Sequence, residues 1–126
     1  MIKIKTRPNE LYFLLNHESA MEILKIFNKM GGDVKVVDQE NTIITFILGD
    51  DERYYKNQSK INLTLTRDGF DFGAEKILEY FNKGAFFPAE FLEFEDLGYK
   101  NKRKRFIRTY FLSDPYTTCR KSAQRQ

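Results

Sequence analysis

The sequence predicts an α+β fold, with a small mixed or antiparallel β-barrel or sheet of five to six strands and two main helices. Three observations support this fold class. Strand-like segments outnumber helix-like ones, they follow one another in runs, and two segments space their apolar residues by three and four. The length of 126 residues fits a single domain, 1–126, with a ragged tail expected from about residue 115.

The first segment alternates isoleucine with lysine over residues 2–5. This period of two predicts a half-buried strand, which Pro8 ends because proline lacks the N–H that a sheet ladder needs. The apolar run 11–15 follows. It fits either a buried strand or a buried turn of helix, and its periodicity does not separate the two.

A helix is predicted over about 18–30, because apolar residues there share one face. Ser19 and Glu22 match a capping box, with Asn16 as a rival N-cap one turn earlier. Gly31-Gly32 supplies the left-handed residue that ends the helix.

Residues 34–37 and 42–48 are rich in β-branched residues and predict an antiparallel hairpin. The second of these strands is apolar on both faces, which favours a central position. Residues 49–60 are polar and predict a loop. Residues 61–65 alternate apolar with polar side chains and predict a one-sided strand.

Asp68-Gly69 favours a tight hairpin turn, after which residues 70–72 are expected to continue as a strand. The second main helix is predicted over about 74–83, and Gly84 ends it.

The last third of the chain predicts three further elements. A short helix is expected over 88–94, because proline is favoured at a first helical position. A basic loop is expected over 97–105. A strand is expected over 106–112, with Ile107, Thr109 and Phe111 on one face.

Charge is divided unevenly along the chain. Residues 1–96 hold 17 acidic and 12 basic residues, a net charge of −5, whereas residues 97–126 hold nine basic residues and one acid, a net charge of +8. A cationic segment on a mildly acidic body favours a polyanionic partner, and nucleic acid is the commonest one.

The basic segment also carries aromatic residues, which stack on unpaired bases while cations bind phosphates. On a strand, Phe106, Arg108 and Tyr110 project from the same face. Two alternatives stay open: a solvated loop entering a charged edge strand, or internal ion pairs with 90–96. The candidate RNA-binding residues are Lys100, Lys102, Arg103, Lys104, Arg105, Phe106, Arg108, Tyr110, Arg120 and Lys121.

The sequence lacks the usual signatures of an enzyme. It has no Gly-rich phosphate loop, zinc-ligand spacing or nucleophile elbow, and His17 is its single histidine. The adjacent carboxylates 50–52 are poorly spaced for a metal ion. We therefore expect a non-enzymatic protein without a cofactor or metal, although a scattered catalytic site would escape this reasoning.

The composition also indicates a compartment. Cys119 is the single cysteine and has no partner for an internal disulfide, which fits a reducing environment. No apolar run approaches the roughly 18 residues of a membrane span, and the N-terminal segment has no signal-peptide core. A cytoplasmic protein is expected.

The alternative function is a protein-interaction module that binds no nucleic acid, such as an inhibitor or accessory factor of a mobile element. It would use exposed aromatic residues, with Tyr54, Tyr55, Phe86 and Phe87 as candidates.

Three stretches, residues 8–12, 14–17 and 48–55, together with the overall length, resemble the PrgU-like small proteins encoded with conjugative plasmids of Gram-positive bacteria. The resemblance implies a PUA-like fold, a small mixed β-barrel with flanking helices of a kind used to bind RNA. It also implies a role in restraining production of a surface adhesin that is toxic in excess. No motif of the family assigns RNA contacts, so the candidate residues rest on charge.

Overall fold

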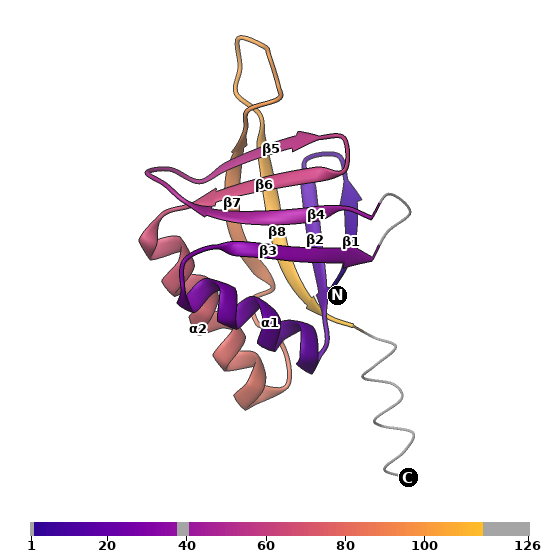
Figure 1. The fold of residues 1–126 in the computed structure, drawn as a ribbon, viewed down its shortest axis with the longest axis vertical. Helices are drawn as coiled ribbons and strands as arrows, with labels where there is room; N and C mark the ends of the chain where they lie inside the picture. The colour runs from indigo at the N-terminus through magenta and orange to yellow at the C-terminus, as the bar shows by residue number, and fades with distance from the viewer. Residues whose placement is uncertain (1, 38–40, 115–126) are drawn as a thin grey trace.

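The computed structural model describes residues 2–37 and 41–114, which form eight strands and two helices (Figure 1). The elements in chain order are β1 (Ile2–Arg7), β2 (Glu10–Leu15), α1 (His17–Asn28), β3 (Gly32–Val37), β4 (Ile43–Leu48), β5 (Arg53–Asn57), β6 (Lys60–Leu65), α2 (Arg67–Lys83), β7 (Glu90–Asp96) and β8 (Phe106–Ser113).

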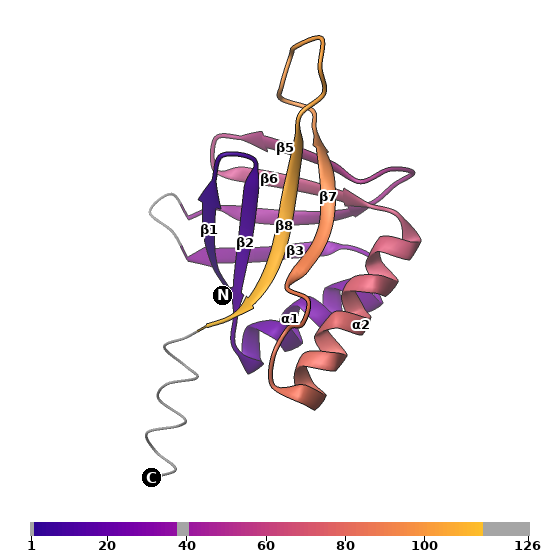
Figure 2. The same ribbon diagram turned by 180° about the vertical axis from the view of Figure 1, so that it is seen from behind.

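The strands close into a barrel in the order β1-β2-β8-β7-β5-β6-β4-β3. The α+β class and the barrel are confirmed, but the barrel has eight strands instead of the five to six expected. The two helices pack against each other at one end of the barrel, and the loop of residues 97–105 projects from the other end (Figure 2).

β1 and β2 form an antiparallel hairpin, so the apolar run 11–15 is a strand. Its turn is Pro8-Asn9, and Asn9 takes the left-handed conformation that asparagine tolerates, with φ of 64°. β2 then pairs in parallel with β8. This pairing brings the N-terminal hairpin beside β8, the last described strand of the chain.

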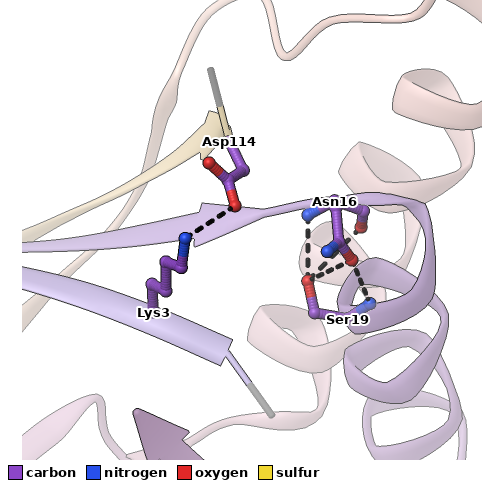
Figure 3. Close-up of polar contacts among 4 residues, drawn as sticks. All are labelled: Lys3, Asn16, Ser19 and Asp114. Atoms are coloured by element: carbon purple, nitrogen blue, oxygen red, sulfur yellow. Dashed lines mark hydrogen bonds and ion pairs between the residues drawn. The ribbon is translucent and has the colours of Figure 1, made fainter. Parts of the chain in front are cut away.

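The cap of α1 is made by Asn16 and not by the predicted pair Ser19 and Glu22. The Ser19 N–H donates to Asn16 Oδ1 at 2.8 Å, and the Asn16 N–H donates to Ser19 Oγ at 2.9 Å (Figure 3). This reciprocal pair is a capping box that starts one turn earlier. The helix ends at Asn28. The first residue after it with positive φ is Met30, at 58°, so the left-handed stop predicted at Gly31-Gly32 begins one residue earlier.

The predicted hairpin of β3 and β4 is confirmed, and β4 lies between β3 and β6. The polar loop predicted over 49–60 is wrong, because its middle part, Arg53–Asn57, is β5. This strand pairs antiparallel with β6. Within β5 only Tyr54 is turned towards the core, so the segment lacks an apolar alternation that would reveal a strand.

The hairpin predicted at Asp68-Gly69 is wrong, because α2 begins at Arg67. Thr66 is the N-cap, and its Oγ1 accepts the Gly69 N–H at 3.0 Å. Phe70 therefore lies on the buried face of the helix and not on a strand. The predicted end is confirmed, since Gly84 has a φ of 80° and its N–H donates to the Tyr80 carbonyl.

The short helix predicted over 88–94 is also wrong. Residues 90–96 form β7, which pairs antiparallel with β8 and contains an irregularity between Glu90 and Glu93. The Thr109 hydroxyl bridges this irregularity: it accepts the Leu92 N–H at 3.0 Å and donates to the Leu92 carbonyl at 2.5 Å. The backbone polar groups freed by the irregular pairing are thereby satisfied.

The core combines aliphatic side chains with phenylalanine rings from the strands and both helices. Phe27 on α1 lies at its centre, with its ring centroid 5.0 Å from Phe46, 5.5 Å from Phe70 and 5.7 Å from Phe91. These contacts join α1 to β4, α2 and β7. Offset and edge-to-face ring contacts of this kind stabilise a core beyond their buried area.

Candidate nucleic-acid interface

β8 has the predicted alternation. Ile107, Thr109 and Phe111 are buried in the barrel, whereas Phe106 and Arg108 are exposed on its outer surface and Tyr110 is half-buried there. The common face predicted for Phe106, Arg108 and Tyr110 is therefore confirmed.

The outer surface of β8 continues across β2 to β1. Lys5, Tyr12 and Tyr110 are register neighbours on the three strands. The rings of Tyr12 and Tyr110 are stacked, with centroids 4.8 Å apart and planes inclined by 15°. Desolvation and then the adjacent Glu10 carboxylate raise the pKa of Tyr12, which keeps its phenol protonated.

A second set of register neighbours lies beside the first. It comprises Arg7 on β1, Glu10 on β2, Arg108 on β8 and Glu93 on β7. The Arg108 Nε lies 3.4 Å from Glu93 Oε2, and the hydrogen bond to Glu93 is the main cause that raises the pKa of Arg108. We call the outer surface of the three strands the β1–β2–β8 face; it comprises Lys5, Arg7, Glu10, Tyr12, Phe106, Arg108 and Tyr110.

The cations of β1 were missed as site residues by the sequence reasoning. The alternation of isoleucine and lysine predicts that the lysines face outward, but it does not show that β1 neighbours β2 and that β2 neighbours β8. Lys5 and Arg7 are exposed, and among residues 2–37 and 41–114 neither has a carboxylate in an ion pair. Lys3 instead pairs with Asp114 at 3.4 Å (Figure 3).

Internal ion pairs, which the sequence left open as an alternative, hold three of the predicted cations. Besides Arg108, Lys104 lies 3.7 Å from Glu95, and Arg105 donates to Asp96 at 2.6 Å. All three carboxylates belong to β7, the strand that pairs with β8.

Among the described residues, the other three predicted cations are Lys100, Lys102 and Arg103 on the loop of residues 97–105, which we call the β7–β8 loop. Each is exposed, and none forms an ion pair with a carboxylate of the described residues. Arg120 and Lys121, and the tail expected from about residue 115, lie outside the described residues. Within the candidate interface, the described cations available to a ligand are therefore those of this loop together with Lys5 and Arg7.

Two shallow hollows indent the barrel surface around Arg108. One has a volume of about 400 Å³ and is lined by Pro8, Asn9, Glu10, Glu93, Phe106 and Arg108. The other has a volume of about 390 Å³ and is lined by Glu90, Phe91, Leu92, Glu93, Arg108 and Thr109.

Other polar residues noted in the sequence have structural contacts. The Glu52 carboxylate accepts the Thr66 N–H at 2.8 Å, beside the start of α2. The ring of His17 packs on Phe81, with centroids 4.7 Å apart, in the first turn of α1. Within the described part of the chain, no group of three acidic, histidine or cysteine side chains is arranged to hold a metal ion.

The four aromatic residues considered for protein contacts divide into two groups. Phe87 and Tyr55 are exposed, by 87% and 43% respectively, whereas Phe86 is buried and Tyr54 is half-buried. The expected exposure of Phe86 and Tyr54 is therefore wrong. Phe86 instead stacks on Tyr80 of α2, with centroids 4.5 Å apart.

Neither helix among the described residues is long and apolar enough to cross a membrane. In comparisons with protein-family models, curated proteins and solved structures, no match to the chain was found. The resemblance to PrgU-like proteins therefore stays a prediction from the sequence.

Proposed function

We propose that the protein is a non-enzymatic regulatory protein that binds single-stranded RNA on the β1–β2–β8 face and the β7–β8 loop. The observation that carries the proposal is the alignment of Lys5 with the stacked pair Tyr12 and Tyr110. A cation beside stacked aromatic rings matches the two needs of a single strand, which are phosphate neutralisation and base stacking.

The distribution of charge favours the β1–β2–β8 face, rather than the outer surface of β7, as the RNA-binding surface. Glu90, Glu93 and Glu95 are pairing partners of β8 residues, and their negative charge disfavours phosphates there. On the other side of β8, Lys5 and Arg7 offer cations that form no ion pair with a carboxylate of residues 2–37 and 41–114. We therefore expect the RNA backbone to run along β1 and the loop, with bases directed towards β2 and β8.

The finer parts of the proposal depend on the resemblance. A closed α+β barrel is compatible with a PUA-like architecture, and PUA-like barrels are used for RNA binding. The restraint of adhesin production on a conjugative element, in the cytoplasm, is proposed on the resemblance and the composition.

The test is fluorescence anisotropy with a labelled single-stranded RNA over a series of salt concentrations. Each phosphate contact contributes a slope of about −0.7 in a plot of log affinity against log salt for single strands. The double variant Lys5→Ala/Arg7→Ala should bind more weakly and reduce the slope by about 1.4.

The matched control is Lys35→Ala/Lys60→Ala. These two exposed lysines flank Ile43 on the outer surface of β3, β4 and β6, and their removal changes the net charge equally. The control should retain the parental slope. If both double variants lose affinity to the same extent, the charge acts without a defined interface and the proposed site is wrong.

A protein-interaction module is the second candidate, and the exposure of Phe87 favours it. Phe87 is 87% exposed, and Leu78 on α2 is 49% exposed; exposed aromatic residues are frequent anchors of protein interfaces. This candidate predicts that the purified protein carries no nucleic acid. The measurement is a low ratio of nucleic-acid absorbance to protein absorbance in the ultraviolet. It also predicts that Phe87→Ser abolishes binding of a defined protein partner without changing the fold.

A further inference from the structure

We infer that the hollow lined by Pro8, Asn9, Glu10, Glu93, Phe106 and Arg108 is a subsite for a guanine base of the bound strand. This inference rests on the proposed RNA binding and adds a preference for one base.

The hollow is formed where the turn between β1 and β2 meets the start of β8. The backbone N–H of Arg108 donates to the Asn9 carbonyl at 2.9 Å and holds the two segments together. The volume of about 400 Å³ lies within the range of small-ligand sites. Phe106 lines the hollow and is 43% exposed, so its ring offers an apolar surface on which a base can stack.

The charged groups of the hollow suit a base better than a phosphate. Glu10 and Glu93 both line it, and Arg108 lies between them, as a register neighbour of each. Two carboxylates against one guanidinium give a negative balance, which repels the RNA backbone. The same three side chains provide both acceptors and donors for the edges of a base.

Guanine is the base that matches these groups on two edges. Its N7 and O6 are adjacent acceptors, which an arginine binds with two N–H groups. Its N1–H and exocyclic amine are adjacent donors, which one carboxylate accepts with two oxygens. Adenine and cytosine place an acceptor beside their amino group, and uracil flanks its single N–H with carbonyl oxygens, so each would direct a lone pair at the carboxylate.

The roles follow from the contacts already present. Glu93 is bound to Arg108 and fixes the direction of its guanidinium. Glu10 accepts a hydrogen bond from the Tyr12 side chain. It forms no ion pair with a cation among the described residues, and we therefore assign to its remaining lone pairs the N1–H and the amine of guanine. Arg7 is the register neighbour of Glu10, and the β7–β8 loop ends next to Phe106, which lines the hollow. These two segments would bind the phosphates on its two sides.

The experiment compares oligouridylates of about eight nucleotides, a length typical of one small barrel, that carry a guanosine, adenosine, cytidine or uridine at the centre. Anisotropy should show that the guanosine strand binds about tenfold more tightly than the others. Glu10→Gln should remove most of this preference, because an amide places a donor beside its acceptor. Its affinity for plain oligouridylate should rise, since a charge that repels phosphates is lost from the RNA-binding face.

Two further variants separate a base contact from a general effect. Glu79→Gln removes a carboxylate of α2 away from the hollow and should keep the guanosine preference. Phe106→Ala should weaken the guanosine strand more than plain oligouridylate. Equal affinity of the parent protein for all four strands would overturn the guanine subsite and leave RNA binding intact. Absence of binding to every strand would overturn the proposed function and the subsite with it.

Discussion

Arg105 donates two hydrogen bonds to a single carboxylate oxygen of Asp96, from Nε at 3.0 Å and from Nη2 at 2.6 Å. The other oxygen of Asp96 accepts the Gly98 N–H at 3.0 Å, and the carboxylate is buried. The Arg105 guanidinium also lies over the Tyr99 ring, 4.6 Å from its centroid. The pair ties the end of β7 to the start of β8 and anchors the loop between them.

Replacement of Arg105 should therefore affect folding more than ligand binding. Arg105→Gln leaves the buried Asp96 carboxylate without its counter-ion, and we expect a loss of about 1–3 kcal/mol in the free energy of unfolding. Urea denaturation measures this loss. Arg103→Gln removes an unpaired cation of the same loop and should change the stability by less than about 0.5 kcal/mol. Equal stability of the two variants would show that the Asp96 pair contributes nothing.

Much of the fold follows from local sequence patterns, and the misses have a physical cause. The alternation in 106–112 and the left-handed stop at Gly84 depend on neighbours in the chain, and both were predicted correctly. β5 and β7 could not be found in this way. Tyr54 is the one residue of β5 that packs against the core, and the irregularity after Glu90 breaks the alternation of β7. Such strands are stabilised by their partners in the barrel, which lie far away in the sequence.

The candidate site was also predictable only in part, because some of its features are local in sequence and others depend on strand pairing. The cationic run and the common face of Phe106, Arg108 and Tyr110 are local features. The ion pairs of Arg108 and Arg105 require β7 to be the neighbour of β8, and the contribution of Lys5 requires two further strand pairings. Strand order is a property of the closed barrel, and the periodicity of single strands does not encode it.

Gly73 lies where α2 approaches the aromatic core most closely. A Cβ at this position would lie 2.2 Å from Phe27 Cε2 and 2.9 Å from Phe91 Cε1. Gly73→Ala should therefore destabilise the protein by about 3 kcal/mol, although alanine favours helices. At Gly84 a Cβ meets nothing within 4 Å, and alanine there should cost only about 1 kcal/mol because φ is 80°. Thermal and urea unfolding of both variants test this expectation. A larger loss of stability for the Gly84 variant than for the Gly73 variant would contradict it.

Tyr54 predicts a loss of stability in alkaline solution. Burial and then the Asp96 carboxylate raise the pKa of Tyr54 above its ordinary value of 10.0. As the pH rises past this value, the unfolded phenol loses its proton first, so the unfolded state binds fewer protons and is stabilised relative to the folded state. The stability from Tyr54 is complete below the ordinary pKa and is lost as the pH rises through the raised pKa. Urea denaturation of the parent and Tyr54→Phe on both sides of pH 10.0 should show the parent losing more stability; a constant difference would refute this.

The three unpaired cations of the β7–β8 loop should contribute to RNA binding without contributing to folding. The triple variant Lys100→Ala/Lys102→Ala/Arg103→Ala is expected to reduce the salt slope of RNA affinity by about 2, since each phosphate contact contributes about 0.7. Its melting temperature should equal that of the parent, because these side chains are exposed and form no ion pair with a described carboxylate. Lys104→Ala, which removes a cation held by Glu95, should change the slope little. A triple variant with the parental slope would show that the loop does not touch the RNA and would confine the interface to the β1–β2–β8 face.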